Sequence, residues 1–328
     1  NNARDNPGED EVRIVRGHYA LPGNVSRPVY GTSVLGGLRI SGGWNTDCTS
    51  QDWVASTTVL DGQHQMGVLQ ITYQATVAQY TRFEIANLTL AHGAGSTYAR
   101  GNGISVFSSA PGQTDLRLDN LIIQGHSGYF GGAVSVNLSR GTLTISNSQF
   151  SANSAPTSAH GHLAATIGAS DNGQAVHLAN NTVVGGDCLG NTGGIRGCGF
   201  GFNLGEGLQL QAVNNLFWQN KLSDLDIEPI GTTASARLDS NRIDVVQGAV
   251  VPTILRAISD DPDFVQSSVG NFRLLPGSLL VNRGMGRIDG LIQPMRDLDD
   301  QPRLALGEFD VGAFENRIGP HIFGNGFD

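Results

Sequence analysis

The chain has almost no lysine and an excess of acidic residues. Among its 328 residues Lys221 is the only lysine, and 20 basic residues stand against 29 acidic ones, which gives a formal charge of −9. Nucleic-acid binders and segments that bind anionic lipids are rich in basic residues, so this balance argues against both partners. An anionic polysaccharide stays open as a ligand, because the local charge of a groove can oppose the net charge.

Long apolar runs and helical periodicity are missing from the sequence. No stretch of 18 apolar residues occurs, so no membrane span is predicted. The three cysteines form no CxxC pair, which argues against a zinc site. Asn-Gly and Asp-Gly turns between alternating runs are scarce, which argues against a β-sandwich. Aromatic residues make up only 7%, whereas the 45 glycines are about twice the usual share.

A repeated phrase is the strongest signal that the chain does carry: apolar, x, apolar, x, Asn, x, x, apolar. It occurs at 83–90, 116–123, 143–150, 176–183 and 210–217. The aligned asparagines are 33, 27, 33 and 34 residues apart. The alternation predicts short strands, and Asn tolerates a left-handed bend and can bond the Asn of the next coil. A period of about 30 residues fits one turn of a solenoid.

Small, Gly-rich stretches recur with the same period. They lie at 101–104, 131–134, 161–164 and 199–202. Each coil should therefore hold a Gly-led strand, a link and the Asn phrase, with the asparagines pointing inward as structural residues. We expect one all-β domain, a right-handed parallel β-helix of about nine coils.

Both ends of such a solenoid should be capped, because open ends would expose strand edges. We expect an N-terminal cap and entry strand over 1–35 and coils over 36–255. Final coils with a C-terminal cap and tail should follow over 256–328. The chain begins at Asn1 rather than Met, which indicates a processed or trimmed chain.

Cys188 and Cys198 bracket a Gly-rich segment with little structure of its own. A disulfide across it would contribute about 2–3 kcal/mol in the loop-entropy model and would indicate an oxidising compartment. Two free thiols are the alternative. Cys48 is left over and is expected to be buried.

Several phrases outside the repeat resemble those of a known family. Segments 38–45 and 57–62 match an entry of the form GG-aromatic followed by T-x-L-D-G. Near the end, DP-x-F, x-F-R-L, PGS, D-x-DG-x-PR and D-hydrophobic-GA-aromatic-E match 261–264, 271–274, 276–278, 297–303 and 310–315. Asp300 stands at a position that is usually Gly. The tail at 321–328 resembles an IF-x-x-GF-acidic ending.

Together these phrases resemble secreted bacterial right-handed parallel β-helix proteins of the pectate-lyase-like superfamily, with a choice-of-anchor type C-terminal region. The resemblance implies this fold and export from the cell. It implies little about function, because such proteins include enzymes and adhesin-like surface proteins.

The segments after each Asn phrase are the longest and most varied, and loops of this kind stack into a wall that binds extended ligands. They run over 91–103, 124–132, 151–162, 185–199 and 218–227. Aromatic faces beside Arg, His and Asp suit a sugar. We therefore predict the ligand-binding residues Tyr98, Tyr129, Phe130, Arg196 and Lys221, and the catalytic residues Arg100, His126, His160, His162 and Asp224. The alternative is that these are ordinary solvated loop residues.

Three kinds of chemistry are possible at such a wall of loops. A lyase acting on uronic acids would use a basic residue to take the proton, and the candidates are Arg100, Arg140 and Arg196. A glycoside hydrolase needs two carboxylates about 5–9.5 Å apart. Its candidates are Asp171, Asp187, Asp224 and Asp226. His160 and His162 could offer two ligands to a metal, although a solvated loop fits them better.

Residues outside the wall complete the predictions. His177 lies between two inward positions of the Asn phrase, so it should point outward on a sheet face. Turn and cap roles suit the acidic C-terminal residues better than calcium does, so no cofactor is predicted, although calcium stays possible. These residues are Asp297, Asp299, Asp300 and Asp310.

The sequence thus indicates a secreted or cell-surface protein that binds or processes a polysaccharide or cell-surface glycan. If it is an enzyme, it is a polysaccharide lyase or a glycoside hydrolase. The alternative is a non-catalytic structural or adhesin-like protein. The sequence does not predict the oligomeric state.

Overall fold

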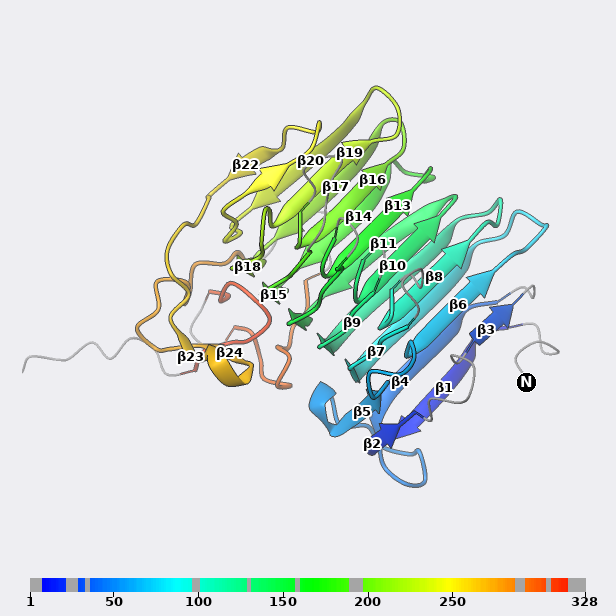
Figure 1. Cartoon of the computed structure of the whole chain (residues 1–328), viewed down its shortest axis with the longest axis horizontal. Coiled ribbons are helices and arrows are strands. Elements are labelled where there is room, and N and C mark those ends of the chain that lie inside the picture. Colours follow the sequence, from blue (N-terminus) through cyan, green and yellow to red (C-terminus); the bar gives the residue numbers. More distant parts are fainter. Residues whose placement is uncertain are drawn as a thin grey trace, which may run out of the picture.

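The computed structural model describes residues 8–21, 29–32, 36–95, 101–128, 131–156, 160–188, 197–286, 293–304 and 308–317. In these ranges the regular elements are strands and two short 3₁₀ turns, η1 (Ala55–Thr57) and η2 (Ser267–Val269). Successive coils stack along one axis (Figure 1), and the chain is a parallel β-helix. This confirms the predicted fold class. The described residues include no helix long and apolar enough to cross a bilayer.

The larger sheet, here called sheet A, runs along the whole solenoid. Nine of its strands pair in parallel in the order β1 (Asp10–Val15), β4 (Leu38–Trp44), β7 (Thr81–Ala91), β9 (Thr114–Gln124), β11 (Gly141–Ser146), β14 (Gln174–Ala179), β17 (Leu208–Val213), β20 (Ala234–Asp239) and β22 (Thr253–Leu255). Shorter strands continue the same sheet beyond the bends: β2 (Gly17–Ala20), β5 (Thr58–Asp61), β12 (Gln149–Ser151), β15 (Thr182–Val184) and β18 (Leu216–Trp218).

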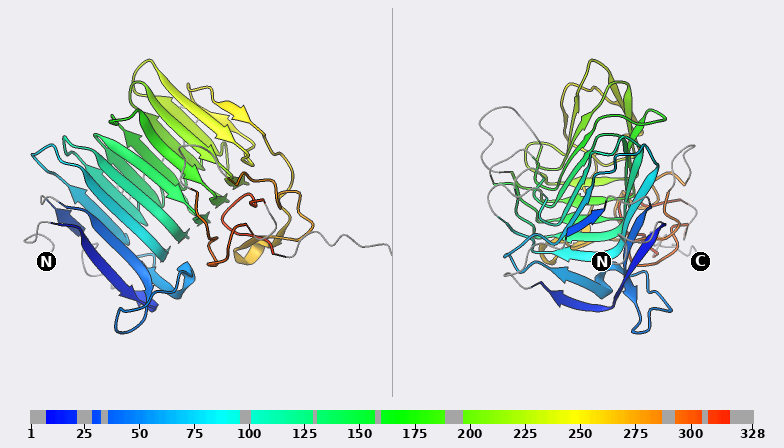
Figure 2. Two further views of the ribbon diagram at one scale, coloured as in Figure 1. Left: turned by 180° about the vertical axis from the view of Figure 1, so that it is seen from behind. Right: turned by 90° about the vertical axis from the view of Figure 1, so that its right-hand side faces the viewer.

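The second sheet, sheet B, has eight strands, and the view from behind in Figure 2 shows the stacked coils that both sheets build. Its strands are β3 (Val29–Thr32), β6 (Leu69–Tyr73), β8 (Ile104–Ser108), β10 (Val134–Leu138), β13 (Leu163–Ile167), β16 (Phe200–Leu204), β19 (Leu225–Pro229) and β21 (Val246–Gln247). All of them pair in parallel. Four of them, β8, β10, β13 and β16, begin at or just after the Gly-rich stretches, as predicted.

Each aligned asparagine makes the predicted bend. Asn87, Asn120, Asn147, Asn180 and Asn214 have φ between 53° and 56°, in the left-handed region that Asn tolerates. A second left-handed residue follows five positions later in each of these coils. It is His92, Gly125, Ala152, Gly185 or Gln219. Three of these five are neither Gly nor Asn, so composition gave no signal of the second bend.

The aligned asparagines stack, but the prediction that they point inward is wrong. Asn120 Nδ2 donates to Asn87 Oδ1 at 2.9 Å, and Asn147 Nδ2 donates to Asn120 Oδ1 at 2.8 Å. The amides of Asn180 and Asn214 instead donate to the carbonyls of Asp310 and Met285, in the C-terminal segment that packs against the bend. The bend thus turns these side chains toward a covering segment rather than toward the core.

The residue after each aligned asparagine takes the inward position. It is Leu88, Leu121, Ser148, Asn181 and Asn215 in successive coils, and all are at most 1% exposed. Asn181 Nδ2 donates to Asn215 Oδ1 at 2.9 Å, and Asn215 Nδ2 donates to Asn241 Oδ1 at 2.8 Å. Buried amides cost free energy unless they are bonded, so this second ladder satisfies polar groups inside the later coils.

Apolar columns fill the space between the two sheets. In sheet A the strand register aligns Ile40, Ile85, Leu118, Ile145 and Leu178, each at most 1% exposed. Each such side chain contributes about 1.5–3 kcal/mol through burial. Phenylalanines pack edge to face within the later coils, with ring centroids of Phe200 lying 4.8 Å from Phe150 and 5.4 Å from Phe217.

Within the described ranges, the chain after β22 packs on the side of the solenoid and does not cover the last coil. There β23 (Phe264–Gln266) and β24 (Asn271–Leu274) form an antiparallel pair, and the orange and red segment lies beside β15 and β18 in Figures 1 and 2. Ile254 continues the inner column after Leu238, yet it is 53% exposed. At the other end, the region predicted as a cap supplies β1, β2 and β3, which pair with the following coil.

Candidate functional site

Five predicted ligand-binding or catalytic residues lie outside the described residues: Tyr98, Arg100, Tyr129, Phe130 and Arg196. The described parts of the loops do stack, since Ser127, Ser154 and Asp187 form successive parallel bridges. Lys221 lies on this wall, with its side chain 56% exposed and Nζ 2.8 Å from Asp187 Oδ2. Its role in ligand binding stays a prediction.

The predicted catalytic residues His126, His162 and Asp224 lie inside the solenoid rather than on the face of the wall. They are 1%, 0% and 3% exposed. With Asn153 and Asn220 they form one buried polar column. His126 N donates to Asn153 Oδ1 at 2.9 Å, and Asn153 Nδ2 donates to His162 Nδ1 at 2.9 Å. His162 Nε2 then lies 3.1 Å from Asn220 Oδ1, and Asn220 Nδ2 donates to Asp224 Oδ1 at 2.9 Å.

These contacts fix the proton positions of both histidines. Because His162 Nδ1 accepts from an amide, Nε2 carries the hydrogen, and burial lowers the pKa of His162 to about 3. His126 Nδ1 accepts from Gly93 N at 2.8 Å, and its Nε2 lies 2.9 Å from Leu90 O. Both rings are neutral and bonded on both nitrogens. Their catalytic role stays a prediction, and their contacts are those of a structural column.

His160 and Asp224 are also held by backbone groups. His160 is 5% exposed, its Nδ1 lies 3.1 Å from Gly197 O, and its ring packs where Gly201 has no side chain. Asp224 Oδ2 accepts from Asp244 N at 2.8 Å, and burial raises the pKa of this carboxyl. His160 and His162 bond different partners, as residues of a packed loop do.

The other hydrolase candidates have different surroundings. Asp171 pairs with Arg140 at 2.5 Å before β14, whereas Asp187 pairs with Lys221 in a loop that leads to sheet B. Asp226 is 2% exposed in β19. A hydrolytic pair among these aspartates stays a prediction.

The predicted disulfide between Cys188 and Cys198 is confirmed. The two Cα atoms are 5.2 Å apart, and both cysteines are buried against Ala155. Cys48 is free and is half-buried rather than buried.

Charged side chains gather on the outer face of sheet A. The strand register places one row there: Glu11, Arg39, Glu84, Arg117, Thr144, His177, Gln211 and Arg237. A neighbouring row contains Arg82, Asp115 and Thr142. On sheet B an outer row is uncharged over five strands: Thr72, Phe107, Asn137, Thr166 and Asn203. The two outer faces therefore present different chemistry to a ligand.

Three adjoining hollows lie on the outer face of sheet A, and we call them together the sheet A groove. The central hollow, of about 300 Å³, is lined by Tyr80, Arg82, Gln113, Asp115, Leu116, Arg117, Thr142, Thr144, Ser146, Asn172 and His177. It shares Arg82 with a hollow toward the N-terminus and Arg117 with a hollow beside the C-terminal segment. Each shared arginine borders two hollows, so the three hollows adjoin one another.

Asp115 organises the central hollow. Its Oδ1 accepts from Gln113 Nε2 at 2.8 Å and from Thr142 Oγ1 at 2.7 Å, while its Oδ2 accepts from Tyr80 Oη at 3.0 Å. Burial and the nearby Asp115 carboxylate raise the pKa of Tyr80, so the phenol stays protonated. The Tyr80 ring is 56% exposed although its hydroxyl is anchored. An exposed ring held in place is suited to stacking on a sugar.

Two side chains of the hollow carry a buried polar atom without a partner in the described part of the chain. These atoms are His177 Nδ1 and Arg117 Nε. His177 points outward from β14 as predicted, and burial lowers the pKa of its imidazole although Asp115 acts in the opposite direction. Arg117 donates from Nη2 to Asp119 Oδ2 at 2.9 Å. Buried polar atoms usually have partners, so these two atoms are exceptions among the groups that line the hollow.

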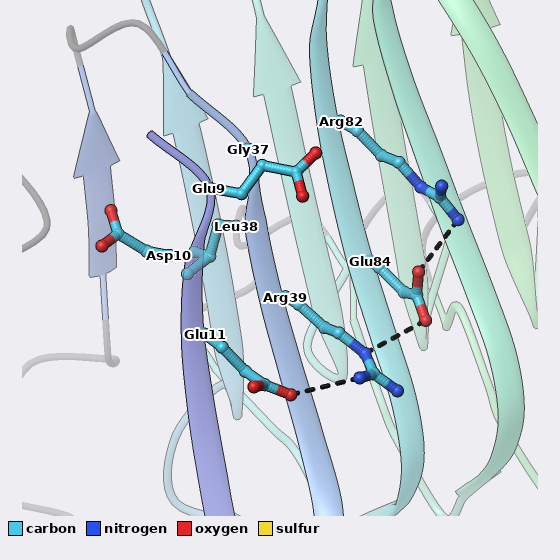
Figure 3. A pocket seen from close by; sticks show the side chains of 8 residues that line it. All are labelled: Glu9, Asp10, Glu11, Gly37, Leu38, Arg39, Arg82 and Glu84. Atoms are coloured by element: carbon cyan, nitrogen blue, oxygen red, sulfur yellow. Dashed lines mark hydrogen bonds and ion pairs between the residues drawn. The ribbon is translucent and has the colours of Figure 1, made fainter. Parts of the chain in front are cut away.

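The hollow toward the N-terminus is lined by a chain of ion pairs (Figure 3). Arg39 lies between two acids, with Nη1 3.1 Å from Glu11 Oε1 and Nε 3.3 Å from Glu84 Oε1. Arg82 Nη2 lies 3.0 Å from the other oxygen of Glu84. Exposed pairs contribute at most about 1 kcal/mol each. Their main effect here is to hold alternating charges in fixed positions across β1, β4 and β7.

The hollow beside the C-terminal segment adds an indole to the groove. Trp53, Asp119, Asn120, Met295 and Arg296 are among its lining residues. Trp53 is half-buried, and the guanidinium carbon of Arg39 lies 5.8 Å from its ring centroid. The groove therefore has an aromatic residue in this hollow as well as in the central one.

Acidic residues of the C-terminal signature have the predicted turn and cap roles. Asp297 Oδ1 accepts from Asp299 N at 3.0 Å and from Gln301 N at 2.7 Å, and Asp310 Oδ1 accepts from Asn282 N at 2.7 Å. Asp300 has φ 61°. This left-handed backbone explains why glycine suits that position.

A buried ion cluster joins this signature to the solenoid. Arg303 is 0% exposed, donates to Asn147 Oδ1, and has Nη1 3.7 Å from Glu315 Oε2. Burial raises the pKa of Asp310 to about 6 and that of Glu315 to about 8, where the neighbouring carboxylates act in the same direction. Burial lowers the pKa of Arg303 to about 10, so the arginine stays charged.

The sheet A groove offers arginines, carboxylates, hydroxyls, a neutral imidazole and two aromatic residues. No group of three or more His, Cys, Asp or Glu that could hold a metal occurs in the described ranges. The signal for the groove was present in the repeat. The residue between its first two apolar positions, such as Glu84, Arg117 or His177, faces outward in every coil. This outward orientation was predicted only for His177.

No protein-family model matches the chain, and no curated protein matches it. The fold agrees with the parallel β-helix that the sequence resemblance implies. The pectate-lyase-like and choice-of-anchor assignments stay predictions.

Proposed function

We propose that this protein binds an extended polysaccharide along the sheet A groove. The observation that supports the proposal most is that three adjoining hollows, which share Arg82 and Arg117 as lining residues, lie on the charged face of the solenoid. A sugar chain needs a long surface, because each ring contributes only a few contacts. Tyr80 and Trp53 supply stacking surfaces in two of the hollows.

Hydrogen-bonding groups of both kinds line the centre of the groove. Thr142 and Thr144 supply hydroxyls, and Arg117 supplies donors that suit a sugar hydroxyl or a carboxylate. His177 Nδ1 and Arg117 Nε have no partner in the described part of the chain. Both atoms are buried, so the hydroxyls and the other donors of Arg117 carry the proposed contacts.

We place this activity outside the cell. The Cys188–Cys198 disulfide supports the assignment, because disulfides persist in oxidising compartments. In this proposal the protein is a secreted or surface-held glycan-binding protein. Cleavage of the glycan is measured in the same experiment.

A panel of neutral and acidic polysaccharides tests the proposal. Binding is measured by affinity electrophoresis, and cleavage by new reducing ends and by the absorbance of unsaturated uronates. At least one glycan should bind, and Tyr80→Ala and Arg117→Ala should each weaken binding about tenfold. Phe107→Ala is the matched control, because Phe107 is an exposed aromatic residue on sheet B. Absence of binding to every glycan, or equal losses in all three variants, would refute the proposal.

Assembly of identical copies through the open end of the solenoid is the second candidate function. Ile254 and Val251 are 53% and 88% exposed beside the edge strand β22. The edge strand β1 carries Glu11 and Arg13, charges that discourage pairing, whereas β22 reads Thr-Ile-Leu. Light scattering at rising concentration tests this candidate, which predicts a dimer in the parent protein and a monomer in Ile254→Lys. A monomer at all concentrations would exclude it.

A further inference from the structure

Two of the eight histidines contact one carboxylate at the N-terminal end of the solenoid, away from the sheet A groove, and a third packs against one of these two rings. They are His18 in β2, His64 after β5 and His92 after β7, and the carboxylate is Asp61 at the end of β5. Figure 1 places β2 and β5 together in the first coils. All three histidine side chains reach solvent, so the cluster is open to small ligands.

Asp61 holds two of these rings in defined orientations. Its Oδ2 lies 3.0 Å from His18 Nε2, and its Oδ1 lies 3.1 Å from His92 Nδ1. A carboxylate accepts hydrogen bonds, so these ring nitrogens carry hydrogen. The lone pair of His92 is therefore on Nε2. Histidines that bind metals are commonly arranged in this way, with the other ring nitrogen donating to a carboxylate.

His64 is fixed beside His92. His64 N donates to His92 O at 2.7 Å, and the two ring centroids are 4.9 Å apart with planes tilted by 40°. A metal bound to both rings at about 2.1 Å per nitrogen with a roughly tetrahedral angle would hold the centroids about 5 Å apart. The centroid separation of the two rings is therefore close to that of a chelated pair.

We propose that His64 and His92 bind one divalent transition-metal ion, with Asp61 positioning the His92 ring. Imidazole ligands favour copper, zinc and nickel over calcium and magnesium, and copper binds most tightly in the series. Because the described residues hold no group of three or more metal ligands, water completes the coordination. The site is independent of glycan binding.

Cu²⁺ is the probe, titrated into the full, tag-free chain by calorimetry and followed by electron paramagnetic resonance. The parent protein should bind one ion with the nitrogen couplings of two imidazoles. His64→Ala and His92→Ala should each weaken binding at least tenfold and leave one coupling or none. His177→Ala is the matched control and should keep both the affinity and the spectrum. Circular dichroism and the unfolding midpoint establish that these surface variants stay folded.

Asp61→Asn separates positioning from direct ligation. It should weaken copper binding about tenfold while both imidazole couplings persist. An unchanged affinity in Asp61→Asn would overturn the role of Asp61. Lack of stoichiometric binding in the parent protein, or binding that survives His64→Ala and His92→Ala, would overturn the site.

Discussion

At the residue scale, His162 shows how a polar side chain can be part of a solenoid core. Its two nitrogens are matched to an amide donor on Asn153 and an amide oxygen on Asn220. The ring is 0% exposed and neutral. Protonation in the fold would put a second hydrogen opposite an amide hydrogen, so the column holds only while the ring stays uncharged.

This arrangement predicts a dependence of stability on pH. The pKa of His162 is about 3 in the fold against 6.5 for a free histidine. The unfolded chain therefore binds more protons between these values, so stability is lost as pH falls from 6.5 toward 3, by about 1.4 kcal/mol per pH unit. In His162→Gln this part of the slope should be missing. Chemical denaturation of both proteins between pH 4 and 7 measures it, with His64→Gln, a change at an exposed histidine, as control. Equal slopes in all three proteins would contradict the assignment.

The shifted pKa of Glu315 should make stability change with pH in the opposite direction. Its pKa is about 8 in the fold against 4.5 for a free glutamate. The folded chain binds the extra proton between these values. The contribution to stability is complete below pH 4.5 and is lost as pH rises toward 8.

Glu315→Gln should remove this loss, because glutamine resembles the protonated acid. Denaturation midpoints measured from pH 5 to 8.5 check this, and the variant should have the flatter profile. A wild-type decline that persists unchanged in the variant would count against a protonated Glu315. Asp299→Asn, a change at a half-buried carboxylate of the same signature, is the control.

At the element scale, the asparagine bends join the coils to the C-terminal segment. The side chains of Asn180 and Asn214 donate to that segment, whereas the residue after each of them faces the core. The repeat predicted the bend because left-handed backbone is a property of Asn itself. It did not predict the direction of the side chain, because direction depends on the segment packed against the bend, which comes from residues about 70–130 positions later.

Arg303 also links the C-terminal segment to the coils, since its guanidinium is buried and donates to Asn147. Arg303→Met should leave the buried carboxylates of Asp297 and Asp310 without their cation and destabilise the segment by about 3–5 kcal/mol. Limited proteolysis followed by intact mass should then show early cleavage within 293–317. Arg283→Met, a change at an exposed arginine, is the control. Equal resistance of the segment to protease in both variants would show that Arg303 does not hold the segment against the solenoid.

At the scale of the whole molecule, the fold was predictable and the candidate site only in part. Alternation, bends and period are local properties of the sequence, so the parallel β-helix could be predicted from them. The loop residues were harder, because nothing local shows whether a polar side chain points into the column, as with His126, or onto the surface, as with Lys221. The groove depends on strand register, which places Glu84, Arg117 and His177 in one row.

The central claim is that the charged face of sheet A, rather than the loop wall, binds a glycan. Affinities for the best polysaccharide of the panel, compared between groove variants and wall variants, test it most directly. We predict that Tyr80→Ala and Arg117→Ala lose about tenfold in affinity, while Tyr98→Ala and Lys221→Ala stay within about twofold of the parent protein. Losses in the wall variants with unchanged binding in the groove variants would contradict the claim.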